Sequence, residues 1–70
     1  MLLSEETIGT IKCYFPLKGY GFISRQKGKD VFFYYKDIEG EEWLLEGVKV
    51  IFDVEKTNKG FQARNIRRLS

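Results

Sequence analysis

Aromatic side chains at alternate positions are the most distinctive chemical groups of this 70-residue sequence. In KGYGFI, which begins at Lys18, Tyr20 and Phe22 would point to one face of a β-strand. Phe32 and Tyr34 repeat this spacing in the next strand-like segment. Such rings could stack on nucleobases, each worth about 1–3 kcal/mol, with Lys18 holding a phosphate beside them. They could instead cover a second small core or meet a partner protein.

Groups suited to enzymatic or metal chemistry are scarce by comparison. The sequence has no histidine and one cysteine, Cys13, so the usual zinc ligand sets and the Ser-His and Cys-His nucleophile pairs are missing. The carboxylates of residues 37–46 stand in turn-like sequence between strand-like segments, which favours a solvated loop over an acid–base pair. We therefore expect no enzyme, no metal site and no cofactor.

Charge is distributed unevenly, although the net charge is only +2. Two basic segments, residues 12–36 and 56–68, flank the acidic residues 37–46. A fold that brings the basic segments together would offer a cationic surface to a polyanion, and scattered solvated charge is the alternative. The lone cysteine and the start MLLSEET, which has no basic and apolar leader, predict a cytoplasmic protein. No apolar stretch approaches the roughly 20 residues that cross a bilayer.

The elements that must position the rings are β-strands, to judge from alternation and turn signals. A chain this short predicts one domain, residues 1–70. Strands are expected at residues 7–15, 19–25, 30–35, 49–56 and 61–69, with a short helical turn at most in residues 36–46. In a small closed barrel, one residue in two fills the interior. The residues expected there are Ile11, Ile23, Val31, Phe33, Val50, Phe52, Val54 and Ile66.

Residues 9–23, GTIKCYFPLKGYGFI, followed by DVFFYY at residues 30–35, resemble the cold-shock domain with its two ribonucleoprotein motifs. The similarity continues to residue 66 and so covers nearly the whole chain. It implies an all-β fold, a five-stranded antiparallel β-barrel of the OB type, that binds single-stranded RNA and DNA through surface aromatics. An RRM fits less well, because Arg25 stands where its motif ends in an aromatic and no segment supplies its two helices.

The resemblance also implies which residues bind nucleic acid. By position these are Lys12, Lys18, Tyr20, Phe22, Phe32, Tyr34, Tyr35 and Lys59. Tyr34 stands where the family usually has histidine, and Tyr35 where it has phenylalanine, so both positions still offer rings. Gly19 and Gly21, which have no side chains, would allow close backbone approach and a sharp strand twist between these rings.

The first strand departs from the family pattern. Cys13 replaces the family's stacking tryptophan, and Tyr14 and Phe15 replace the phenylalanine and asparagine that follow it. Strict alternation would bury Cys13 beside Ile11, whereas the family pattern would place it on the binding face through a local bulge. We hypothesise that Tyr14 or Phe15 partly replaces the lost ring, and we count Tyr14 among the nucleic-acid-binding residues.

Two further aromatic residues lie outside the motifs. Trp43 is the nearest counterpart of the family's loop phenylalanine, and it either caps a base track or, as we favour, packs beside Leu44 and Leu45. Phe61 replaces a common proline before the last strand and is interpreted as an ordinary strand residue.

The sequence therefore predicts a sequence-tolerant binder of single-stranded RNA and DNA, acting as an RNA chaperone or a regulator of transcription or translation. No membrane partner is expected, and the protein is expected to be a monomer, with a homodimer as the alternative. The competing function is a barrel whose aromatic patch docks a protein partner or its own copy. Salt would separate the two, because log affinity for a single strand falls with log salt by about 0.7 per phosphate contacted.

Overall fold

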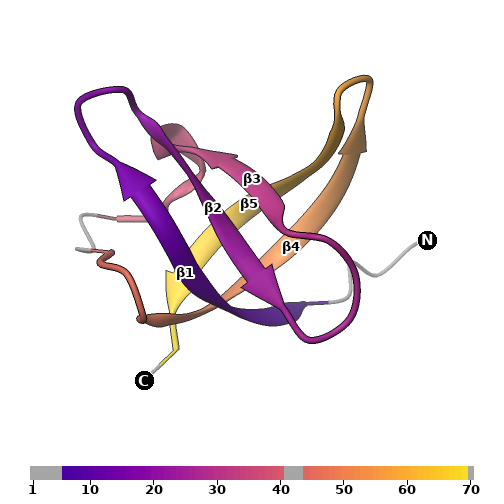
Figure 1. The fold of residues 1–70 in the computed structure, drawn as a ribbon, viewed down its shortest axis with the longest axis horizontal. Helices are drawn as coiled ribbons and strands as arrows, with labels where there is room; N and C mark the ends of the chain where they lie inside the picture. The colour runs from indigo at the N-terminus through magenta and orange to yellow at the C-terminus, as the bar shows by residue number, and fades with distance from the viewer. Residues whose placement is uncertain (1–5, 41–43, 70) are drawn as a thin grey trace.

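A computed structural model describes residues 6–40 and 44–69, and its five strands form a closed barrel (Figure 1). The elements are β1 (Thr7–Phe15), β2 (Tyr20–Arg25), β3 (Val31–Tyr34), the 3-10 turn η1 (Tyr35–Asp37), β4 (Lys49–Thr57) and β5 (Gly60–Arg68). Each strand begins and ends within one residue of the predicted position. In this part of the chain, no helix is long and apolar enough to cross a membrane.

The strands follow one another around the barrel in the order β1-β2-β3-β5-β4, and β4 returns to pair with β1. Neighbouring strands are antiparallel except β3 and β5, which are parallel and pair at Phe32 and Gln62. In Figure 1 the β1–β2 and β4–β5 turns extend from the upper side of the barrel, and the β2–β3 turn extends from the lower side. The predicted all-β barrel is thus confirmed.

Alternate residues of the strands fill the barrel interior. The buried hydrophobic residues are Ile11, Ile23, Val31, Phe33, Leu44, Val50, Phe52, Ala63 and Ile66. The predicted core is therefore confirmed except at Val54, which is half-buried and packs against the cluster. Leu44 and Ala63 were not predicted, because Leu44 comes from a loop with no strand alternation and Ala63 has too small a side chain to stand out in a pattern.

A β-bulge in β1 decides which side chains face outward. Ile11 pairs with Ile23, but the next pair is Cys13 with Phe22, so Lys12 is the extra residue. Because a bulge shifts the alternation by one position, Cys13 shares the outer face with Phe22 and is half-buried. Of the two alternatives left open for Cys13, the structure therefore shows the local bulge, and not burial beside Ile11 by strict alternation.

Gly21 lies between two outward-facing rings because the core leaves no room for a side chain at this position. A Cβ added to Gly21 would lie 2.7 Å from Cζ of Phe33 and would also meet the carbonyl oxygen of Cys13. Tyr14 is the β1 partner of Gly21 and packs its ring against Phe33, with the ring centroids 5.5 Å apart. Gly21 therefore leaves space for the packed rings of Tyr14 and Phe33, while its neighbours Tyr20 and Phe22 direct their rings outward.

Candidate nucleic-acid interface

Four rings from β2 and β3 form one surface outside the core. In the strand register Tyr20 lies opposite Tyr34, and Phe22 lies opposite Phe32. Phe32 is the centre of the cluster, because its ring centroid lies 4.6 Å from that of Tyr34 and 5.7 Å from those of Phe22 and Tyr20. The rings meet in tilted and edge-on arrangements, as aromatic pairs prefer. The predicted gathering of these four rings is confirmed, and we call them the aromatic surface.

Phe15 extends the aromatic surface onto β1. It pairs with Tyr20, their ring centroids are 5.4 Å apart, and Phe15 is 42% exposed. The Nζ of Lys18 lies 6.0 Å from the centroid of Phe15, at the limit of a cation–π contact. Tyr14, in contrast, faces the inner side against Phe33. Of the two residues hypothesised to replace the lost ring, Phe15 is the one on the aromatic surface, and nucleic-acid binding by Tyr14 stays a prediction.

Beyond Phe22, the surface continues into a hollow of about 450 Å³ around Cys13. Its lining residues are Lys12, Cys13, Phe22, Lys29 and Asp30. The Nζ of Lys12 donates a hydrogen bond to Oδ2 of Asp30 at 2.7 Å. This hydrogen bond, assisted by the charge of the carboxylate, raises the pKa of Lys12 above its ordinary value. Lys12 therefore lies at the edge of the aromatic surface, as predicted, with Asp30 as its partner.

On the opposite side, the aromatic surface borders a groove of about 370 Å³ that reaches the β4–β5 turn. The groove is lined by Phe22, Phe32, Tyr34, Thr57, Lys59, Phe61 and Gln62. Oγ1 of Thr57 donates to the carbonyl of Gly60 and accepts from the N–H of Lys59, which fixes the turn. Lys59 is thus placed beside the rings, as the resemblance implies. Phe61 also lines this groove, which the sequence interpretation missed.

Asp37 holds the backbone of Tyr34, one of the residues of the aromatic surface. It is buried, and its Oδ2 accepts hydrogen bonds from the N–H of Tyr34 and from Nε2 of Gln62, both at 2.9 Å. Its Oδ1 lies 3.1 Å from Nε of Arg64. One carboxylate thus connects β3, η1 and β5 behind Tyr34. The expectation of a wholly solvated acidic loop is wrong for Asp37, because this carboxylate has three partners that replace water.

Tyr35 and Trp43 belong to the segment that follows β3. The N–H of Tyr35 donates to the carbonyl of Gly19, and its ring packs so closely on Gly19 that a Cβ there would lie 3.0 Å from Cδ1. Gly19 also has a φ of 80°, which glycine tolerates best. Tyr35 therefore lies at the turn end of the aromatic surface, and its side chain is exposed there. The prediction for Trp43 lies outside the described residues.

Lys12 is paired with Asp30, whereas other cations near the rings stay available to a polyanion. Arg64 pairs with Asp37 and Glu55, and Arg67 pairs with Glu6 and Glu39. Lys18, Lys59 and Arg25 form no ion pair with any residue that the structure describes. The same residues contain no group of three His, Cys, Asp or Glu side chains placed to hold a metal ion.

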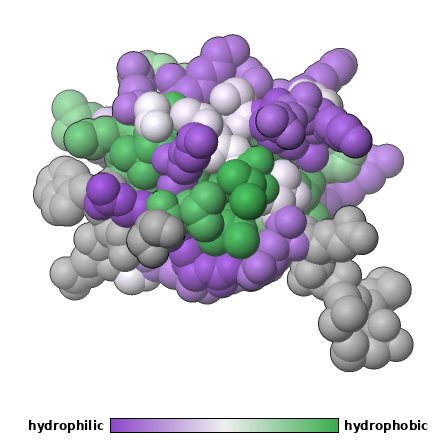
Figure 2. All heavy atoms as spheres, turned by 90° about the horizontal axis from the view of Figure 1, so that it is seen from below, coloured by the Kyte–Doolittle hydropathy of each residue, from purple (hydrophilic) through white to green (hydrophobic). Residues whose placement is uncertain are grey.

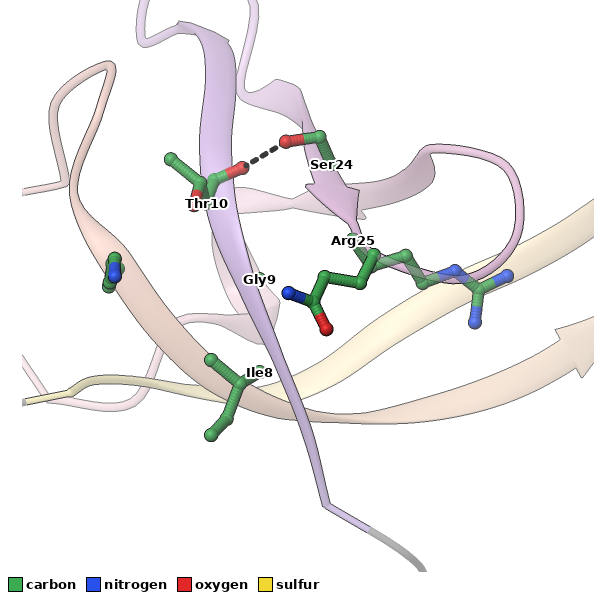
Figure 3. Close-up of a pocket in the computed structure, with 7 residues that line it drawn as sticks. Ile8, Gly9, Thr10, Ser24 and Arg25 are labelled. Atoms are coloured by element: carbon green, nitrogen blue, oxygen red, sulfur yellow. Dashed lines mark hydrogen bonds between the residues drawn. The ribbon is translucent and has the colours of Figure 1, made fainter.

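A separate cavity of about 490 Å³ lies at the other end of β1 and β2 (Figure 3). Its lining residues are Ile8, Gly9, Thr10, Ser24, Arg25, Gln26 and Lys49, none of them aromatic. The hydroxyl of Ser24 donates to the carbonyl of Thr10, and the Arg25 side chain extends away from Gly9 (Figure 3). Figure 2 shows that apolar patches also occur among hydrophilic residues on the face seen from below. This cavity has no aromatic ring on which a base could stack.

A closed barrel with surface rings on adjacent strands and lysines beside them defines a small nucleic-acid-binding barrel of the OB type. Residues 7–69 match the family model described as the "Cold-shock" DNA-binding domain, and the chain belongs to this family. The predicted family, fold and nucleic-acid binding are thereby confirmed.

Named relatives agree with this family membership. The chain is 47% identical over 64 residues to the major cold shock protein of Streptococcus pyogenes serotype M1, covering 89% of this chain and 96% of the relative. It is 44% identical over 62 residues to cold shock protein CspC of Bacillus subtilis, covering 86% and 94%. The solved structure of Drosophila Unr CSD456 matches with a TM-score of 0.81 at 22% identity, which supports the fold. That match covers 96% of this chain and 28% of the longer Unr chain.

Proposed function

We propose that the protein binds single-stranded RNA and DNA with little sequence preference by stacking bases on the aromatic surface. The observation that carries this proposal is the continuous arrangement of five rings on one face, Phe15, Tyr20, Phe22, Phe32 and Tyr34. Every base has a π-face, so such a row accepts any sequence. A duplex hides these faces inside its stack, which is why a single strand suits this surface better.

The phosphates would be held by cations at the rim of the surface. Lys18 lies near Phe15, Lys59 lines the groove beside Tyr34, and Lys12 borders the hollow at Cys13. Tyr35 would contact the strand at the turn end. We assign Tyr14 a supporting part, because its ring packs behind the surface against Phe33.

Binding of this kind would make the protein an RNA chaperone or a regulator of transcription or translation. A strand bound through its bases cannot pair, so binding alone shifts a hairpin equilibrium toward the open form without ATP. No catalytic step is part of this function.

The second candidate is contact with a protein partner or with a second copy of the chain. One observation favours it: Leu17, beside Phe15 in the β1–β2 turn, is fully exposed at 103% of its reference area. An exposed apolar tip next to rings suits a protein interface.

The decisive experiment is fluorescence anisotropy of labelled T-rich and A-rich hexamers across a salt series. We expect Phe22→Ala and Phe32→Ala each to cost about 1–3 kcal/mol. With three or four phosphates contacted, log affinity should fall with log salt at a slope of roughly −2 to −3. Ile8→Ala is the matched control, because Ile8 is exposed but lines the cavity without rings.

A folded protein that binds neither hexamer at low salt would refute the single-strand proposal. If sedimentation then showed a size that increases with concentration and depends little on salt, the aromatic surface would be a protein interface.

A further inference from the structure

Arg25 and Phe61 form a contact that joins the end of β2 to the start of β5. The guanidinium carbon of Arg25 lies 5.4 Å from the centroid of the Phe61 ring, within the range of a cation–π interaction. The two residues are far apart in the sequence, so the barrel fold alone brings them together.

The β2–β3 turn holds the guanidinium in place. Nε of Arg25 donates to the carbonyl of Lys29 at 2.9 Å. Gly28, with a φ of 101°, passes so close that an added Cβ would lie 2.9 Å from Nη2 of Arg25. The backbone of the β2–β3 turn and the Phe61 ring therefore both position the guanidinium.

Phe61 lines the same groove as rings of the aromatic surface. It is 47% exposed and lines the groove together with Phe22, Phe32, Tyr34 and Lys59. A ring on a barrel rim normally loses rotamer freedom when a ligand binds, and a contact that fixes the ring beforehand reduces that loss. A proline at this position would offer neither a π-face nor a partner for the guanidinium.

We propose that Phe61, held by Arg25, forms an additional stacking subsite for one nucleobase at the β5 side of the aromatic surface. Lys59 and the guanidinium supply positive charge for the phosphates that flank this base. The proposal rests on the proposed function, because the subsite extends the same strand track. It predicts that the protein binds a strand one nucleotide longer than the rings of β1, β2 and β3 can accommodate.

The test is anisotropy with labelled oligothymidylates of three to eight nucleotides. In the wild type, affinity should rise with length until the Phe61 subsite is filled. Phe61→Ala should remove the last increment, lowering affinity about tenfold for the longest strands and little for the shortest. Phe61→Tyr, which keeps the ring, should restore the increment. Arg25→Lys should keep the salt dependence but lose part of the increment, because an ammonium lacks the planar stacking surface.

The possible outcomes separate this inference from the proposed function. If Phe61→Ala has no effect while Phe22→Ala weakens binding at every length, the subsite is refuted and the aromatic surface stands. If Phe61→Ala weakens all lengths equally and lowers the melting temperature, the ring is a structural support and the inference is wrong. If the folded wild type binds no length, both proposals fail.

Discussion

Cys13 lies directly opposite Phe22 on the outer face of the β1–β2 pair, and the bulge at Lys12 is what places it there. The small thiol leaves a hollow of about 450 Å³ beside the Phe22 ring. At this position the family usually has a stacking tryptophan, so the chain keeps the backbone geometry for a ring without the ring itself.

Cys13→Trp should therefore increase the affinity for a single-stranded hexamer. The indole would occupy the hollow beside Phe22 and add one stacking partner, worth about 1–3 kcal/mol. Cys13→Ala is the control and should leave affinity unchanged, because the thiol makes no stacking contact. Anisotropy titrations measure both variants. A folded tryptophan variant with wild-type affinity would show that this part of the face does not receive a base.

Phe15→Ala and Tyr14→Ala should separate binding from stability. Phe15 is exposed beside Tyr20, so its loss should cost about 1–3 kcal/mol of binding free energy and little stability. Tyr14 packs on Phe33, so its loss should lower the free energy of unfolding by about 1–3 kcal/mol. Urea denaturation and anisotropy on the same samples check this division. Equal losses of affinity with unchanged stability would place both rings on the binding face.

Asp30→Asn should release Lys12 for a phosphate contact. The hydrogen bond to Asp30 raises the pKa of Lys12 above 10.5, so the pair is intact at neutral pH and is lost only as pH rises through the raised value. Without the carboxylate, the slope of log affinity against log salt should steepen by about 0.7. Asp53→Asn is the matched control, since Asp53 accepts a hydrogen bond from Asn65 elsewhere on the barrel. An unchanged slope would mean that Asp30 does not keep Lys12 from the phosphates.

Gly21→Ala should destabilise the barrel. The new methyl group would overlap the Phe33 ring and the Cys13 carbonyl, and overpacking of this kind costs about 1–3 kcal/mol. Chemical denaturation measures the loss. Shortening the opposing ring with Phe33→Leu should recover part of it, so the double variant should be more stable than the sum of the single changes predicts. Strict additivity would point to the backbone contact as the whole cause.

The strands and most of the core were predictable because a half-buried strand shows its two faces in the sequence. Ile23, Val31 and Phe33 alternate with outward rings, and turn residues mark where each strand ends. The bulge at Lys12 was not predictable from alternation, since one extra residue leaves no mark in the composition of β1. Only the family pattern suggested it.

The site residues that were missed are those whose role depends on neighbours distant in the sequence. In the sequence, Asp37 looks like the other acidic residues of its loop. Its contacts with Gln62 and Arg64 of β5 are what make it a buried acceptor. In the sequence, Phe61 is one more aromatic residue of a strand, and only the structure places Arg25 over its ring. A large ring in place of a common proline was the one available signal.

The parallel junction of β3 and β5 makes the backbone pairing between strands uneven around the barrel. These strands pair at Phe32 and Gln62, with a bridge between Ile38 and Ile66 beyond them, whereas β4 and β5 pair along most of their length. Regions with few backbone hydrogen bonds open most readily, so amide hydrogens along this seam should exchange first. The groove that contains Phe32 and Phe61 spans the same seam. A strand seated there would hold both sides together, so nucleic acid would protect its own binding site against opening.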